Sequence, residues 1–210
     1  MTTQDVAREG GMHWGDDVAC TYFQQAELDL DRHWDSLIFP FIGMLSFDTV
    51  LDIAAGHGRN AAKLSAYAKR IICVDINPDN VCYMKQRFSG DRRFTIILND
   101  GVSLQAVNDG AVDLAYSFDS MVHFDLRVIT AYLEECMRVL RVGGHAFIHH
   151  SNFSGNPGGD FRRNPHWRNY MSSELFMHLA CCAGFSVLST QTIAWGGIPD
   201  LDGLALLQKV

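Results

Sequence analysis

The most informative residues of this chain surround a glycine turn, Gly56-His57-Gly58, which follows the apolar run 49–53 and precedes the helix-forming residues 61–64. Glycines let the backbone approach a ligand closely, and the amino end of a helix offers unpaired N–H groups to an anion. Asp75 lies 19 residues after Gly56, at the end of a second apolar run. An acid at that place commonly accepts hydrogen bonds from both hydroxyls of a ribose. The spacing therefore predicts a cofactor site.

A second pair of candidate residues, Asp119 and His123, follows the apolar stretch 113–118. The two are four residues apart, so they share one face if a helical turn begins there. A neutral histidine near pH 7 can take a proton from a substrate hydroxyl. We therefore expect His123 to be a general base with Asp119 beside it. The alternative is that His123 only packs or caps.

A pair of histidines, His149 and His150, ends the apolar run 145–150. Successive strand residues face opposite ways, so we expect at most one of the two to face a cleft. His150 is favoured as catalytic, with His149 close behind, and a core histidine is the alternative for each. Histidine and carboxylate side chains also suit Zn or Mn. Because no acid-rich ligand spacing is present, we predict no metal site.

The segment 156–170 is locally basic in an acidic chain. Its arginines Arg162, Arg163 and Arg168, together with Trp167 and Tyr170, could recognise a polar or anionic acceptor such as a sugar or a phosphate-bearing intermediate. The alternative is a solvated loop or an oligomer contact.

The elements that must position these residues alternate along the chain. The pattern predicts strands at about 49–53, 71–75, 94–98, 113–118 and 145–150, and helices at about 58–68, after Asn77-Pro78, and at 126–140. Asn77 is a plausible helix cap, with Pro78 in the first turn. Gly143-Gly144 should end the last of these helices. Such alternation indicates a parallel sheet with helices on both faces.

The carboxy-terminal part differs from this pattern. A helix capped by Ser172 or Ser173 should run to about residue 183, followed by strands at 185–193 and 204–210. The stretch between them, 196–203, is rich in Gly, Pro and Asp, so we expect an antiparallel hairpin.

The first 48 residues precede the first strand. We expect residues 1–12 to be mobile and 17–45 to form two helices, the second broken near Pro40. The aromatic residues Trp14, Tyr22, Phe23 and Trp34 could form a flap over the cofactor and the substrate, or could simply pack on the sheet.

The pattern Asp52-x-Ala54-x-Gly56-x-Gly58 resembles the acid-x-Gly-x-Gly-x-Gly loop of class I S-adenosylmethionine-dependent methyltransferases, with alanine at the first glycine. Alanine is acceptable there if that position needs only a negative φ. The similarity covers about residues 49–210. It implies an α/β fold: a Rossmann-like, seven-stranded, mostly parallel sheet with a C-terminal antiparallel hairpin, helices on both faces and an N-terminal helical cap.

The resemblance also implies a cofactor, S-adenosylmethionine, with S-adenosylhomocysteine as product. Asp52 would then lie near the cofactor's ammonium group, Asp75 would hold the ribose, and Asp100 would accept from the adenine amino group. Asp100 could instead serve only the turn Asn-Asp-Gly. The residues expected at the cofactor are Asp52, Ala54, Gly56, Gly58, Asn60, Asp75, Ile76, Asp100, Gly101 and Phe118.

Length and composition indicate one domain, with a cap at 1–48 and a catalytic core at 49–210. A net charge of −7 argues against nucleic acid as a partner. We expect neither export nor a membrane span, because no signal-peptide pattern occurs and the longest apolar run is broken by Pro40. Six cysteines without C-x-x-C spacing predict reduced, mostly buried thiols in a cytoplasmic protein. A second copy of the chain, in a homodimer, is a further possible partner.

Together these features favour methyl transfer to a small-molecule acceptor, most readily a hydroxyl. Two alternatives stay open. Gly56-x-Gly58-x-x-Ala61 also matches a dinucleotide fingerprint, which would indicate a nicotinamide-dependent oxidoreductase. The third option is a protein that binds the cofactor without turnover.

Overall fold

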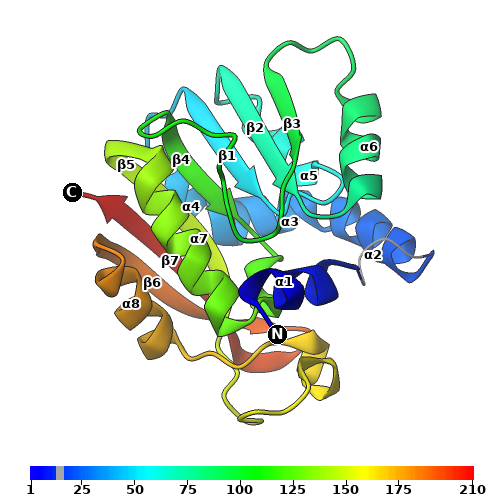
Figure 1. The fold of residues 1–210 in the computed structure, drawn as a ribbon, viewed down its shortest axis with the longest axis vertical. Helices are drawn as coiled ribbons and strands as arrows, with labels where there is room; N and C mark the ends of the chain where they lie inside the picture. The colour runs from blue at the N-terminus through cyan, green and yellow to red at the C-terminus, as the bar shows by residue number, and fades with distance from the viewer. Residues whose placement is uncertain (13–16) are drawn as a thin grey trace.

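The computed structural model describes residues 1–12 and 17–210, and it shows a twisted central sheet with helices on both faces (Figure 1). Within these residues the sheet has seven strands in the order β3-β2-β1-β4-β5-β7-β6. The first five strands in the chain run parallel, β7 is antiparallel to β5, and β6 is antiparallel to β7. The predicted fold class is confirmed. The strands are β1 (Thr49–Ile53), β2 (Arg70–Asp75), β3 (Phe94–Leu98), β4 (Val112–Ser117), β5 (Leu140–Ser151), β6 (Phe185–Trp195) and β7 (Ile198–Lys209).

Helices cover both faces of the sheet, as the alternation of elements predicts. On one face lie α7 (Leu126–Val139) and α8 (Ser173–Cys182), with α1 (Thr3–Met12) packed beside α7. On the other face lie a π-helical turn (Trp34–Ile38), α4 (Phe39–Ile42), α5 (Arg59–Leu64) and α6 (Pro78–Arg87). Helices α2 (Asp17–Leu28) and α3 (Leu30–His33) lead into that second layer.

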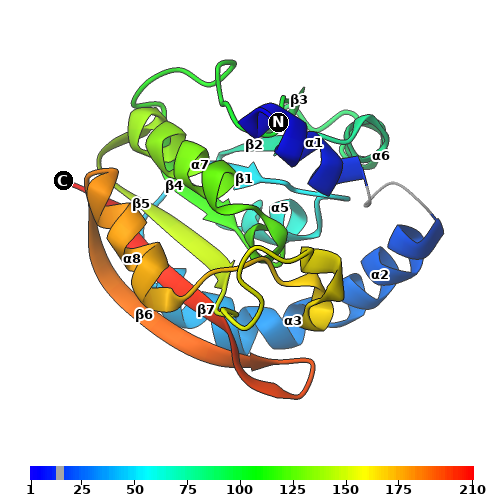
Figure 2. The same cartoon turned by 60° about the horizontal axis from the view of Figure 1, so that its bottom comes forward.

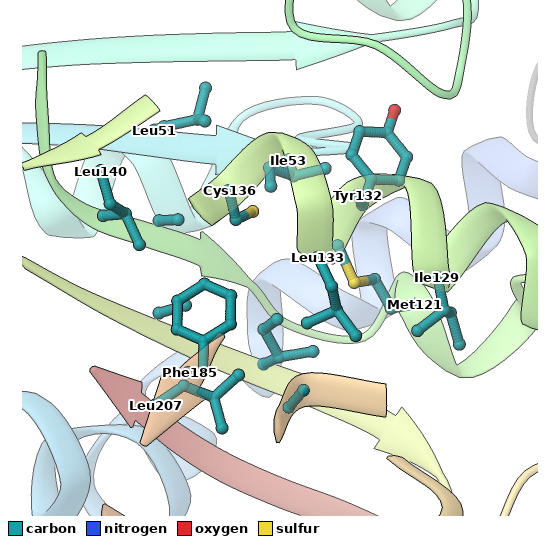
Figure 3. Packing of buried hydrophobic residues seen from close by; sticks show 14 of the residues in the cluster. Leu51, Ile53, Met121, Ile129, Tyr132, Leu133, Cys136, Leu140, Phe185 and Leu207 are labelled. Atoms are coloured by element: carbon teal, nitrogen blue, oxygen red, sulfur yellow. The ribbon is translucent and has the colours of Figure 1, made fainter. Parts of the chain in front are cut away.

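Helix α7 illustrates how the sequence builds this packing. Its apolar residues recur every three or four positions, so they form one stripe that faces the sheet. Ile129, Leu133 and Cys136 are buried in the same hydrophobic cluster as Leu51 and Ile53 of β1, and Figure 3 shows Cys136 beside Ile53. The predicted helix over 126–140 is confirmed except for its last residue.

The amino ends of two helices follow the predicted capping chemistry. The side chain of Asn77 accepts from the backbone N–H of Asp79 at 2.9 Å, with Pro78 in the first turn of α6. Ser172 accepts from Leu175 N at 3.2 Å and begins α8. These caps satisfy N–H groups that the helices leave unpaired.

The boundary between α7 and β5 differs from the prediction. The helix ends at Val139, β5 already begins at Leu140, and Gly143-Gly144 lies inside the strand. Gly143 has a φ of 76°, and the pairing of β5 with β4 shifts its register in this region. The glycines therefore serve a bulge rather than a helix end.

The hairpin is also longer than predicted. Its turn consists of Gly196 and Gly197 alone, both with positive φ, and Trp195 pairs directly with Ile198. Two successive positive φ values are the requirement of a type I′ turn, which matches the twist of the flanking strands. As a result, Asp202 and Gly203 lie within β7 and not in a loop.

The N-terminal region is more structured than predicted. Residues expected to be mobile form α1, where Val6 and Ala7 pack against the core and the side-chain amide of Gln4 donates to Asp100 at 2.9 Å. The break near Pro40 is present as a π-helical turn, in which Phe39 N donates to Trp34 O. Proline has no N–H to continue the regular ladder.

No helix among the described residues is long and apolar enough to cross a lipid bilayer. Of the cysteines whose side chains are described, Cys73 and Cys136 are buried, and Cys82, Cys181 and Cys182 are exposed; all five are free thiols. The expectation that most thiols are buried is therefore wrong for this part of the chain.

The strand order places β1 between β2 and β4. After β1 the chain continues outward on one side through β2 and β3, and then returns to the other side of β1 to form β4. Ligands of open α/β sheets bind at such a switch point, outside the carboxyl ends of the strands. In Figure 2, α1 and the loop that follows β5 lie on either side of this edge.

Candidate functional site

A cavity of about 550 Å³ opens at the carboxyl edge of β1, β2 and β4. One half is formed by the glycine loop, the end of β2 and helix α1; the other half is formed by the segment after β4 and the loop after β5. The cofactor half includes Ala7, Gly11, Ala54, Gly56, Asp75, Ile76 and Gly101, and the other half includes Tyr22, Asp119, Ser120, His123, Phe124, Phe161, Arg162 and Asn169.

The glycine loop turns through left-handed conformations. The φ values are 55° at Ala54, 57° at Gly56 and 76° at Gly58. The negative φ that would make alanine acceptable at this position is therefore not present. A left-handed alanine costs roughly 1–2 kcal/mol, because its Cβ crowds the following carbonyl. The loop thus stores strain at the rim of the cavity.

Asp75 connects the glycine loop with the end of β2. One carboxylate oxygen accepts from Gly56 N at 2.8 Å, and the other accepts from Asn77 N at 2.8 Å and from the Asn80 amide at 3.2 Å. The residue is only 5% exposed yet lines the cavity. Burial raises the pKa of this carboxyl group, and the three hydrogen bonds oppose that rise.

Five of the expected cofactor residues lie outside the cavity lining: Asp52, Gly58, Asn60, Asp100 and Phe118. Asp52 is 1% exposed, and one of its oxygens has no hydrogen-bond partner. Burial raises the pKa of Asp52 to about 8, although Arg59 opposes this. The side chain of Asn60 accepts from the Tyr116 hydroxyl at 3.2 Å. Phe118 packs against His149 and Trp195.

Asp100 forms a turn and does not line the cavity. Its Oδ1 accepts from Val102 N at 3.0 Å and Ser103 N at 2.7 Å, and its Oδ2 accepts from Gln4. This is the turn chemistry that the Asn-Asp-Gly sequence allows. The neighbouring Gly101 does line the cavity, where a Cβ would come within 2.5 Å of the Ile76 side chain.

Asp119 is the most constrained residue of the cavity wall. Its φ is 61°, its carboxylate accepts from Arg59 at 2.9 Å and from the Tyr22 hydroxyl, and its N–H donates to His149 Nδ1 at 3.1 Å. Burial would raise the pKa of this carboxyl, but the Arg59 cation, followed by Arg168 and the hydrogen bond from Tyr22, holds it below its usual value. Asp119 is therefore an ionised group beside the cavity.

His123 lies on a 3₁₀ turn (Met121–His123) and lines the same cavity. Its Nδ1 lies 2.9 Å from the Trp167 carbonyl oxygen. A carbonyl only accepts, so Nδ1 carries the ring proton and Nε2 is the basic nitrogen. Burial, followed by the nearby Arg168 cation, lowers the pKa of His123 to about 4. The ring is thus neutral at pH 7.

The two strand histidines face opposite sides of the sheet, as predicted, but neither lines the cavity. His149 is fully buried between Asp119 N and Asp202, which lies 2.9 Å from Nε2. The ring of His150 stacks on Phe176 at 4.0 Å on the other side of the sheet. Strand alternation sends one ring into each helical layer, so the structure does not support a catalytic position for either.

Of the three arginines in the basic loop after β5 that we expect to face an acceptor, Arg162 lines the cavity, whereas Arg163 and Arg168 do not. Arg168 is buried and paired with Asp202, and Arg162 pairs with Asp160 at 2.9 Å on the exposed rim. Gly158, Gly159 and Phe161 of this loop do line the cavity.

The aromatic flap is present in part. Tyr22 and Phe23 line the cavity, and the Phe23 ring stacks on His57 at 3.9 Å above the glycine loop. Trp34 is buried against Tyr67 in the opposite layer, and Trp14 lies outside the described residues.

Sequence reasoning did not identify Arg59, Ser120, Phe124 or Asn169, which complete the cavity wall or its ion pairs. Only their proximity to the glycine loop and to strand ends could have indicated them. Among residues 1–12 and 17–210, no group of three His, Cys, Asp or Glu side chains could hold a metal ion.

Comparisons with known proteins agree with this geometry. The model of a methyltransferase domain family matches residues 50–144. A Mycolicibacterium smegmatis protein named as a probable S-adenosylmethionine-dependent methyltransferase is 30% identical over 156 residues, covering 73% of this chain and 58% of the relative. The demethylmenaquinone methyltransferase of Clavibacter sepedonicus is 27% identical, covering 56% and 47%. The chain thus spans about half of these relatives' lengths.

Solved structures share the fold. A methyltransferase from Aquifex aeolicus superposes with a TM-score of 0.66 at 16% identity, covering 97% of this chain and 98% of that one. The cyclase SpnF superposes with a TM-score of 0.68 at 17% identity, covering 85% and 80%. The fold is therefore shared by proteins with different chemistry, so function must be argued from the site.

Proposed function

This chain belongs to the class I S-adenosylmethionine-dependent methyltransferases, and we propose that it transfers the methyl group of S-adenosylmethionine to a small-molecule acceptor. The observation that carries this proposal is one cavity in which the glycine loop and Asp75 face Asp119 and His123. Relatives named for phosphoethanolamine and demethylmenaquinone support a small acceptor.

The residues present fit this cofactor. Three protein donors use three of the about four lone-pair sites of the Asp75 carboxylate, so one site remains to accept from a ribose hydroxyl. The backbone at Gly56 and Gly101 lies at the cavity, where it can approach the cofactor closely. Asp52 is buried outside the cavity lining, so a water rather than the cofactor would satisfy its orphaned oxygen. Ile76 and Ala7 would enclose the adenine.

We further propose a hydroxyl as the acceptor, as in a sugar or a natural-product intermediate. When bound, the cofactor supplies an electrophilic methyl group on a sulfonium. His123 is neutral and has its proton fixed on Nδ1 by Trp167, so Nε2 can take the hydroxyl proton. Asp119, ionised beside the cavity, would favour the imidazolium that forms. Tyr22, Phe124 and Phe161 would orient the acceptor and exclude water.

Calorimetric titration with S-adenosylmethionine, S-adenosylhomocysteine and NAD tests the cofactor. We expect heat with the first two and none with NAD, and binding of NAD alone would overturn the proposal. Hydroxylated sugars and phenols are then screened by mass spectrometry for a gained methyl group, with and without chelator. Exclusive methylation of amines or thiols would contradict the hydroxyl acceptor while leaving methyl transfer intact.

A further inference from the structure

A buried carboxylate outside the cavity, that of Asp202 on β7, is hydrogen-bonded to two different elements. It is fully buried, and it accepts from Arg168 Nε at 2.8 Å, from Arg168 Nη2 at 2.6 Å and from His149 Nε2 at 2.9 Å. Arg168 itself is only 2% exposed. Such an arrangement is costly to desolvate, and apolar residues of similar volume are often as stable. Stability alone is therefore a weak reason for it.

One arm of this arrangement runs from Asp202 through His149 to Asp119. A backbone N–H can only donate, so Nδ1 of His149 accepts from Asp119 and the ring proton must lie on Nε2, facing Asp202. The carboxylate thus fixes the tautomer that can accept. Asp119 needs this support because its φ of 61° is unfavourable for a residue with a side chain.

The second arm runs from Asp202 through Arg168 to His123. Arg168 Nη1 donates to His166 O at 3.0 Å, and the backbone at His166 and Trp167 adopts positive φ values of 46° and 56°. The Trp167 carbonyl that results from this turn accepts from His123 Nδ1. Anchoring Arg168 therefore holds the carbonyl that orients the His123 ring.

We infer that Asp202 is a positioning residue for methyl transfer, holding Asp119 through His149 and His123 through Arg168. This inference rests on the proposed function, because it gives Asp119 and His123 their roles. None of the three buried residues lines the cavity or touches the reacting atoms. A single carboxylate between β5 and the following loop thus sets the spacing of the proposed base and its neighbouring anion.

Two variants separate the arms. In the double variant Arg168→Met, Asp202→Asn, the asparagine oxygen still accepts from His149 while the guanidinium is gone, so only the arm to His123 is cut. In His149→Phe the Asp202–Arg168 pair stays intact, so only the arm to Asp119 is cut. The matched control is Glu135→Gln, Arg138→Met, which removes an ion pair on α7 that lies outside the cavity lining.

The readouts are NMR signals, turnover and cofactor-product affinity. In the double variant we expect the His123 ring N–H signal to shift while the Asp119 amide signal is retained. In His149→Phe we expect the Asp119 amide signal to shift while the His123 ring N–H signal is retained. Both should lose about tenfold to a hundredfold in kcat, as expected for a small misplacement of reacting groups. Affinity for S-adenosylhomocysteine should stay within about threefold. The control should lose stability without losing kcat.

Folded variants with wild-type kcat and unmoved signals at Asp119 and His123 would disprove the inference. If the double variant does not fold, His149→Phe decides the matter alone through the Asp119 amide signal. If the wild type methylates no acceptor, the proposed function fails, and the two NMR signals still show whether Asp202 positions both residues.

Discussion

The backbone N–H of Asp119 lies 3.1 Å from Nδ1 of His149, so a residue of the cavity wall is hydrogen-bonded into the centre of the sheet. This bond explains how a left-handed aspartate can be held at a ligand site. It also explains why a histidine near the end of β5 is needed although it does not reach the cavity.

Replacing Asp75 with alanine should weaken the binding of S-adenosylhomocysteine by about tenfold to a hundredfold. Hydrogen bonds to a charged group contribute roughly 1.5–3 kcal/mol, and Asp75 also fixes Gly56 N. Calorimetry measures the change. Asp100→Asn is the control, because its turn lies outside the cavity lining and should leave affinity within about twofold. A larger effect at Asp100 than at Asp75 would reverse our assignment.

Replacing Ala54 with glycine should raise the free energy of unfolding by up to about 1 kcal/mol. Glycine adopts a φ of 55° without the Cβ clash, and this gain exceeds the entropy that glycine loses on folding. Urea unfolding measures it. The neighbouring Ala55 is buried and does not have a positive φ, so Ala55→Gly should destabilise the protein. If both variants changed the free energy of unfolding in the same direction, strain at Ala54 would not be the cause.

Replacing His123 with glutamine should lower kcat by about 10²–10⁴-fold while cofactor affinity is retained, because only proton removal is lost. In the wild type, protonation of His123 should reduce kcat/KM as pH falls through about 4, with no contribution between pH 6 and 8. The control is His145→Gln, since His145 is not part of the cavity lining. Unchanged turnover in His123→Gln would remove this residue as the base.

Acid should destabilise the fold through its buried histidines. Burial lowers the pKa of His150 from 6.5 to about 4, so between these values the unfolded chain binds a proton that the folded chain does not. The contribution of His150 to the free energy of unfolding is therefore fully present above pH 6.5. It falls by roughly 3 kcal/mol as the pH decreases toward 4. His150→Phe keeps a ring on Phe176 and should flatten the pH dependence of urea unfolding. An unchanged slope would show that His150 does not contribute.

Local sequence was sufficient for the elements whose signals are short-range. The apolar runs, the cap at Asn77 and the stripe of α7 predicted strands and helices correctly, because hydrogen bonding and burial within one element depend on adjacent residues. The glycine loop and Asp75 were also found from spacing alone, since a strand–turn–helix unit fixes their separation.

Only the tertiary structure decided which polar side chains form hydrogen bonds with one another. A type I′ turn at Gly196-Gly197 sets the register of β7, and a shift of one residue would turn Asp202 to the other face of the sheet. That register brings Asp202 to His149 and Arg168, residues 53 and 34 positions away, and the alternation of β5 sends His150 into the opposite core. Sequence determined the glycine loop and Asp75 because one contiguous strand–turn–helix–strand unit carries them, whereas Ala7 and Gly11 of α1 reach the cofactor half of the cavity only through packing. The acceptor half is assembled from distant segments, so only their packing could place Asp119 and His123.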